Sequence, residues 1–175
     1  MTSLLDESTR LSSASQETVT STASVIIRCD ADVVSARQQA CAIGEQLGLL
    51  RFDLALVATA LLELAHNILS HAGRGEILLR IVQDGARRGL SMVARDEGPG
   101  IADIELALRD GYSTTGSLGL GLPGVRRLMD EFAITSVIGC GTTVAVCKWV
   151  RQRGGYDRHL AYCVGRGRAP VPRRG

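Results

Sequence analysis

The chain has 175 residues, 45% of them hydrophobic and 3% aromatic, which is enough for one domain with a core of aliphatic side chains. No apolar run reaches the length of a membrane span, and the N-terminal residues lack the basic start and apolar centre of an export signal, so we expect neither a membrane protein nor an exported one. The five cysteines are odd in number and form no Cys-x-x-Cys pair, which indicates free thiols in a reducing cytoplasm.

Charge divides the chain unevenly. Residues 1–150 carry 13 basic and 17 acidic groups, a balance of −4, whereas residues 151–175 carry 7 basic groups and 1 acidic group, a balance of +6. The Ser/Thr-rich residues 1–23 and the Gly-, Pro- and Arg-rich residues 151–175 have little to bury, so we expect both to be disordered and the folded domain to span residues 24–150. The basic tail is more typical of a solvated extension than of a segment that binds nucleic acid.

The first half of the domain predicts one strand and two helices. Residues 24–29 form a short β run, after which Asp30 and Asp32 supply N-cap chemistry for a helix that Gly48 ends. A second helix should begin near residue 52 or 53 and end near residue 71, with Gly73 just beyond it. Its apolar positions follow the helical period and comprise Leu54, Val57, Leu61, Leu64 and Ile68.

The second half of the domain predicts two hairpins separated by a helix. Residues 76–83 and 89–95 are typical of strands joined through Asp84-Gly85, and residues 133–138 and 142–150 of strands joined through a Gly-Cys-Gly turn. Residues 120–131 carry a helical pattern. Hairpins with helices between them predict an α+β fold, in which helices cover one face of a mixed, mainly antiparallel sheet.

Glycine concentrates in the segment 96–124, which holds seven glycines. Dense glycine lets the backbone come close to a ligand, and the N–H groups that open the following helix favour an anion, so a phosphate is the expected guest. A flexible surface loop is the alternative, but a strand precedes the segment and a helix follows it. Asp96 ends that strand and is interpreted either as an Asx-turn cap or as an acceptor for the exocyclic amine of adenine.

Glu63 and Asn67 lie four residues apart and therefore share one face of the second helix. They are either ordinary helix surface or a site in which the Asn67 amide oxygen binds Mg²⁺ and Glu63 is the general base. Similarly, the segment Gly141-Thr142-Thr143 is either a simple hairpin turn or the source of a hydroxyl that reaches a base or a bridging water.

The sequence lacks the residues that other nucleotide-binding and metal-binding motifs require. Lys148 is the only lysine, so neither a Walker A lysine nor the strand lysine of eukaryotic-type kinases is present. Gly119-x-Gly121-x-x-Gly124 matches the dinucleotide fingerprint, but it follows a polar loop and no acidic residue stands near position 144. Cysteine and histidine show no metal-ligand spacing.

Taken in order, the motifs resemble the N box and the three G boxes of the GHKL superfamily, which unites gyrase, heat-shock-ninety, histidine-kinase and MutL ATPases. They are Glu63-x-x-x-Asn67, Asp96-x-Gly98-x-Gly100, Gly116-x-x-Gly119-x-Gly121 and Gly141-Thr142. The resemblance covers residues 24–149 and is strongest to the anti-sigma regulatory branch, in particular to the RsbT-type switch-protein serine/threonine kinases. It implies the Bergerat or histidine-kinase-like fold, a two-layer α/β sandwich, with a lid over residues 110–118.

The resemblance also implies ATP and Mg²⁺ as cofactors and a role for each matched residue. Glu63 would be the base, Asn67 the Mg²⁺ ligand and Asp96 the residue that recognises adenine. The other matched positions, which would contact the phosphates, the lid or the adenine, are Gly98, Gly100, Gly116, Gly119, Gly121, Thr142 and Thr143.

Members of this branch transfer the γ-phosphate of ATP to a Ser or Thr of a small STAS-domain partner of the anti-sigma-antagonist type. STAS proteins are therefore the expected partners, with a PP2C-type phosphatase as a further one. The alternative is an anti-sigma factor that holds a sigma factor in an ATP-dependent manner. Some anti-sigma kinases carry a lid arginine where this chain has Ser117, which favours the switch kinase. The residue that would supply the stabilising positive charge at the γ-phosphate is then not identified, and Arg74 and Arg109 are the candidates.

Overall fold

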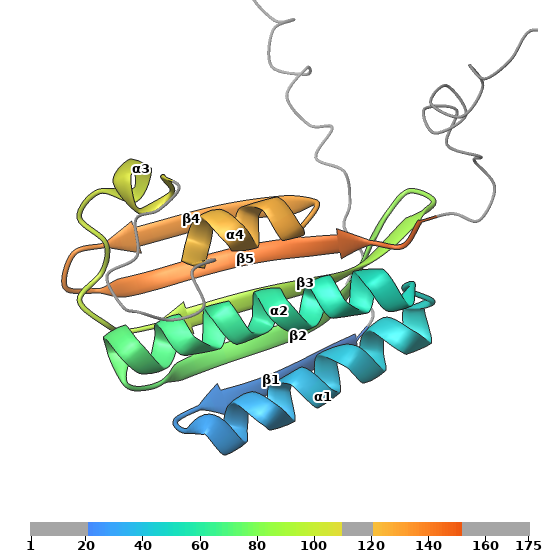
Figure 1. The fold of residues 1–175 in the computed structure, drawn as a ribbon, viewed down its shortest axis with the longest axis horizontal. Coiled ribbons are helices and arrows are strands. Elements are labelled where there is room, and N and C mark those ends of the chain that lie inside the picture. Colours follow the sequence, from blue (N-terminus) through green and yellow to red (C-terminus); the bar gives the residue numbers. More distant parts are fainter. Residues whose placement is uncertain (1–20, 110–120, 152–175) are drawn as a thin grey trace, which may run out of the picture.

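The computed structural model describes residues 21–109 and 121–151, which form an α+β sandwich (Figure 1). The described strands join in one sheet in the order β1-β2-β3-β5-β4, and every pairing between them is antiparallel. The strands are β1 (Ser21–Ile27), β2 (Gly75–Asp84), β3 (Arg87–Asp96), β4 (Glu131–Val137) and β5 (Gly141–Trp149). The expected mainly antiparallel sheet is thus confirmed, and β1 begins three residues before the expected start.

Three helices cover one face of this sheet, which confirms the two-layer arrangement (Figure 1). They are α1 (Asp30–Leu47), α2 (Arg51–Asn67) and α4 (Gly121–Leu128). A one-turn helix, α3 (Ile104–Ala107), follows the Gly-rich loop, and the sequence pattern did not predict it. A local interaction nevertheless starts this helix: Asp103 is its N-cap, and the Asp103 side chain accepts a hydrogen bond from the Leu106 N–H at 2.8 Å.

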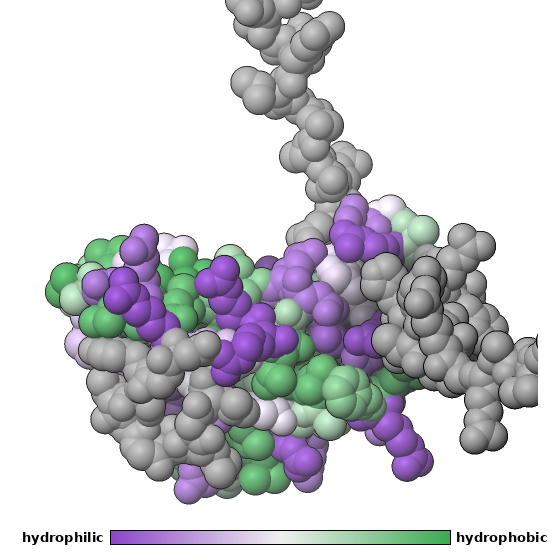
Figure 2. Space-filling view, turned by 45° about the horizontal axis from the view of Figure 1, so that its top comes forward, coloured by the Kyte–Doolittle hydropathy of each residue, from purple (hydrophilic) through white to green (hydrophobic). Residues whose placement is uncertain are grey.

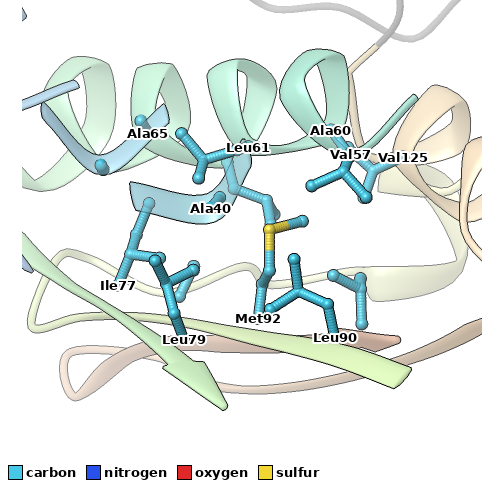
Figure 3. Close-up of a cluster of buried hydrophobic side chains, with 14 of the residues drawn as sticks. Ala40, Val57, Ala60, Leu61, Ala65, Ile77, Leu79, Leu90, Met92 and Val125 are labelled. Atoms are coloured by element: carbon cyan, nitrogen blue, oxygen red, sulfur yellow. The ribbon is translucent and has the colours of Figure 1, made fainter. Parts of the chain in front are cut away.

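The core lies between α2 and the central strands (Figure 3). The apolar stripe predicted for the second helix is confirmed at four of its five positions, since Val57, Leu61, Leu64 and Ile68 are each at most 1% exposed. Leu54, the fifth, is half-buried and packs against the same core. By length and composition the helical run Arg51–Ala72 is also long and apolar enough to cross a membrane, contrary to the expectation that no apolar run reaches that length. Half of its apolar window is buried inside the domain, as expected for a core helix that packs on a sheet.

The start of α1 differs from the expectation. Its N-cap is Cys29, whose side chain caps nothing, so neither Asp30 nor Asp32 is the N-cap residue. Asp32 instead reaches back from the first turn, and its Oδ2 accepts the Arg28 backbone N–H at 3.0 Å. The Arg28 side chain also donates to this carboxyl, which lowers the pKa of Asp32. The other end is as predicted, because Gly48 stops the helix in the left-handed conformation.

Helix α4 ends at Leu128 rather than at residue 131, because the acidic side chains that follow it form hydrogen bonds with residues of β5. Asp130 accepts hydrogen bonds from Lys148 Nζ at 2.9 Å and from the Trp149 backbone N–H at 2.8 Å. Glu131 accepts from Trp149 Nε1 at 2.8 Å and is already the first residue of β4. A tertiary contact therefore ends this helix where the local pattern continues.

Candidate functional site

A cavity of about 300 Å³ lies where the ends of α2 and β3 meet the starts of α4 and β5. Every wall is formed by the end of an element or by the loop after β3. The wall residues are Leu64, Asn67, Ile68, His71, Ala94, Asp96, Pro99, Gly100, Ile101, Ala102, Asp103, Ala107, Gly121, Leu122, Thr142 and Val144. Of the residues predicted for the site, the structure brings Asn67, Asp96, Gly100, Gly121 and Thr142 to this one cavity.

Asp96 is fixed at one end of the cavity by the loop and by β5. Its Oδ1 accepts the Gly98 N–H at 2.9 Å and the Thr142 N–H at 3.3 Å. The Asx-turn interpretation of Asp96 is therefore correct for one carboxylate oxygen. The second oxygen, Oδ2, has no hydrogen-bond partner among residues 21–109 and 121–151, so the same side chain also offers an acceptor to a ligand.

The glycines of the Asp96 loop allow segments of the protein itself to pack closely. A Cβ on Gly98 would lie 2.8 Å from the Ala72 side chain, and Gly98 packs there rather than lining the cavity. Gly100 has φ +75° and no room for a Cβ, which would lie 2.3 Å from the Val137 carbonyl oxygen. Gly100 also lines the cavity, so its conformation holds the loop against the β4–β5 hairpin at the cavity rim.

Glu63 and Asn67 are brought to the site by the end of α2. Asn67 lines the cavity, whereas Glu63 lies one turn earlier, is only 4% exposed and is not a wall residue. The Glu63 Oε2 accepts the N–H of Gly121, the first residue of α4, at 3.0 Å. The positive end of a helix favours such a carboxylate, so Glu63 is held where α4 enters the cavity wall.

The last turn after α2 is a π-helix, η1 (Ile68–Ala72), where the sequence predicted a continued α-helix. After this wider turn the chain enters β2 at Gly75, where the backbone packs closely against its neighbours. A Cβ on Gly75 would lie 2.4 Å from the Arg95 carbonyl oxygen and 2.8 Å from the Ile68 side chain. Such π-turns occur frequently at functional sites. This one carries His71 to the cavity wall, a residue that spacing alone did not assign to the site.

The two threonines of β5 lie on opposite faces of the sheet. Thr142 and Val144 line the cavity, and because side chains alternate along a strand, Thr143 points away from it. Thr143 lines a second hollow on the outer face, together with Arg74 and Arg95. The structure therefore does not bring Thr143 to the cavity of Asp96, and strand alternation was the signal that separates it from Thr142.

The remaining predicted residues of the site and its lid do not line the cavity or lie outside the described residues. Gly116, Gly119, Ser117 and the expected lid over residues 110–118 lie outside the described residues. Arg109 is exposed and is not a wall residue.

Figure 2 shows hydrophobic residues gathered at the end of the molecule that carries α3 and the β4–β5 turn, where Val137 and Ile138 are exposed.

A metal ion would have few protein ligands here. No group of three or more His, Cys, Asp or Glu side chains within residues 21–109 and 121–151 is arranged to hold one. Mg²⁺ bound with a nucleotide does not require such a group, because it keeps several waters and takes one or two protein ligands besides the phosphates. Asn67, whose amide belongs to the cavity wall, is the predicted ligand that the structure leaves in a suitable place.

The family model of the histidine kinase-like ATPase domain matches residues 28–148. The chain belongs to this family. Among curated proteins it is 47% identical to the serine/threonine-protein kinase RsbT of Bacillus subtilis (strain 168) over 127 residues, which cover 73% of this chain and 96% of that kinase. It is 29% identical to the anti-sigma F factor of Thermoanaerobacter sp. (strain X514) over 119 residues, covering 66% and 83% of the two chains.

A third relative, the anti-sigma F factor of Geobacillus sp. (strain WCH70), is 28% identical over 125 residues. The resemblance to GHKL ATPases and the fold that it implied are thereby confirmed. A histidine kinase-like ATPase domain uses ATP, and the cavity lining contains both an acceptor, on Asp96, and the start of a helix, at Gly121. An adenine amine suits the first feature and a phosphate the second.

Proposed function

We propose that this chain is a serine/threonine protein kinase of a bacterial partner-switching module. It transfers the γ-phosphate of ATP to a Ser or Thr of a STAS-domain partner. The observation that carries the proposal is the 47% identity to a serine/threonine kinase over 96% of that protein's length. The anti-sigma F factors, at 28–29% identity and 83–84% of their length, support the alternative less well.

The geometry around Glu63 supports the chemistry of this kinase. A buried carboxylate that accepts the Gly121 N–H lies one helical turn from Asn67, and both Gly121 and Asn67 line the cavity. In the transfer, the acceptor hydroxyl loses its proton to Glu63 and its oxygen bonds to the γ-phosphorus, while the bond from that phosphorus to the β-phosphate oxygen breaks. Such a general base typically contributes ~10²–10⁴-fold to the rate.

Asn67 and the Gly121 helix start serve the phosphate end in this scheme. Mg²⁺, bound by the Asn67 amide oxygen and the phosphates, would supply charge stabilisation there. Phosphoryl transfer needs mainly positioning and electrostatic stabilisation, so a domain of this size suffices. Asp96 orients the adenine at the other end of the cavity. Arg74 lines the outer hollow and Arg109 is not a wall residue, so neither supports a role at the γ-phosphate.

The proposal includes the partners and the compartment. STAS-domain proteins are the phosphate acceptors, and a chain released from its phosphorylated partner activates a downstream PP2C-type phosphatase. The reaction takes place in the cytoplasm, where ATP is available and thiols remain reduced.

Incubation with [γ-³²P]ATP, Mg²⁺ and a STAS protein from the same host tests the proposal directly. We expect label on a Ser or Thr of the STAS protein, and none when EDTA removes Mg²⁺. A pull-down from the native host distinguishes the two functions: STAS proteins support the kinase, whereas a sigma factor retained only with ATP, together with unlabelled STAS protein, supports the anti-sigma factor.

A further inference from the structure

Ser136 is a half-buried residue of β4 that no motif singled out and that does not line the nucleotide cavity. Its Oγ nevertheless contacts two segments that do. It accepts the Ile101 N–H at 2.8 Å, from the loop after β3, and it lies 2.9 Å from Thr142 Oγ1 on β5. A third contact is the Gly141 carbonyl oxygen at 3.1 Å.

The valence of a hydroxyl group decides the direction of these hydrogen bonds. A serine hydroxyl has one proton to donate and two lone pairs that accept. The Ile101 N–H occupies one lone pair, and the Gly141 carbonyl can only accept, so it takes the proton. All three contacts are then hydrogen bonds only if Thr142 donates its own proton to the second lone pair of Ser136.

This assignment determines what Thr142 presents to the cavity. With its proton directed at Ser136, the Thr142 hydroxyl offers only lone pairs. Its neighbour across the β3–β5 pairing is Asp96, whose Oδ1 already accepts two N–H groups and whose Oδ2 has no partner in the part of the chain that the structure describes. Asp96 Oδ2 and the Thr142 hydroxyl therefore both face a ligand as acceptors.

We propose that Ser136 is a positioning residue that sets the base preference of the nucleotide site, by holding Thr142 as an acceptor beside Asp96. The exocyclic amine of adenine has two N–H donors for such a pair, whereas guanine carries a carbonyl oxygen at the same ring position. Two facing acceptors repel, and neither is then satisfied. The inference rests on the proposed ATP site and extends it to a residue outside the cavity wall.

Calorimetric titration with ATP, GTP and purine riboside triphosphate, which lacks the exocyclic amine, tests the proposal. The wild type should bind ATP about 5- to 100-fold more tightly than either of the others, as expected when a desolvated polar group loses its partner. Ser136→Ala frees the Thr142 proton, so ATP affinity should fall within the same range while affinity for the amine-free analogue changes little. The ratio of the two affinities therefore shrinks.

Three variants serve as controls. Ser136→Thr keeps the hydroxyl and should keep the ratio, and Ser136→Cys fills the same space with a weak donor and should shrink it. Thr135→Ala removes the neighbouring hydroxyl, which β alternation places on the outer face, and should change neither affinity. Circular dichroism and thermal melting establish that each variant is folded.

The outcomes separate this inference from the proposed function. A wild type that binds neither ATP nor GTP overturns both. A wild type that prefers ATP, with a folded Ser136→Ala and Ser136→Cys that retain the full ATP preference, overturns the role of Ser136 alone. Equal losses for ATP and for the amine-free analogue in these variants also overturn it, because they mean that Ser136 only supports the loop.

Discussion

Glu63 has two roles that substitution can separate. Its carboxylate accepts a hydrogen bond from the start of α4, and it is the proposed general base. Glu63→Gln keeps an oxygen that can accept the Gly121 N–H, now at 3.0 Å, but it removes the basic carboxylate. Phosphotransfer should then fall ~10²–10⁴-fold, equivalent to about 3–5 kcal/mol in the barrier, while ATP affinity and stability stay near wild type.

Glu63→Ala removes both roles. Glu63 is only 4% exposed and Gly121 is half-buried, so the Gly121 N–H loses its partner in a partly desolvated place, and the free energy of unfolding should fall by about 1–3 kcal/mol. For a domain of this size the midpoint of thermal unfolding should drop by roughly 4–12 °C. Transfer should be as low as in Glu63→Gln.

The assay measures single-turnover transfer to a STAS protein, ATP affinity and thermal unfolding on the same preparations. Glu45→Gln is the matched control, since Glu45 is exposed on α1 and should leave all three unchanged. Undiminished transfer in Glu63→Gln would refute the assignment of Glu63 as the base. A loss of stability in Glu63→Gln equal to that in Glu63→Ala would show that the charge, rather than the hydrogen bond, holds α4.

Four further predictions follow from other contacts. Asp96→Asn replaces Oδ2 by a donor, so ATP affinity should fall by about 1–3 kcal/mol and the preference over GTP should shrink in parallel titrations; unchanged affinities would leave Asp96 as a loop cap only. Gly141→Ala should lower the melting temperature, because φ is +105° and a Cβ would lie 2.0 Å from the Asp96 carbonyl oxygen; a wild-type melting curve would contradict the close packing. Lys148→Met should lower the free energy of unfolding by about 3–5 kcal/mol in chemical denaturation, because it removes the buried cation 3.9 Å from Asp53 and leaves only Arg151, whose side chain is 64% exposed, at 3.7 Å; a neutral effect would mean that Arg151 compensates for the lost cation. Truncation after Arg151, which keeps the 3.7 Å contact with Asp53, should preserve folding and transfer, and a large loss of either would place the domain boundary later in the chain.

The sequence alone determined the features that depend on near neighbours. The apolar period of α2 defined its buried stripe, Asp84-Gly85 defined the β2–β3 turn, and Gly48 ended α1. The resemblance to the GHKL boxes also assigned Asn67 and Asp96 to one nucleotide site, and both line the same cavity. These features were predictable because side-chain period and backbone preference act over a few residues.

The tertiary structure alone decided the features that depend on distant partners. The helical pattern of α4 continues past Leu128, and only the bonds of Asp130 to Lys148 and Trp149 end the helix there. The hydrogen bond between Ile101 and Ser136 spans 35 residues of sequence, and that between Glu63 and Gly121 spans 58. Such pairs leave no periodic trace in the sequence, because each partner is an ordinary polar residue until the packing of helices on the sheet brings its donor and acceptor together.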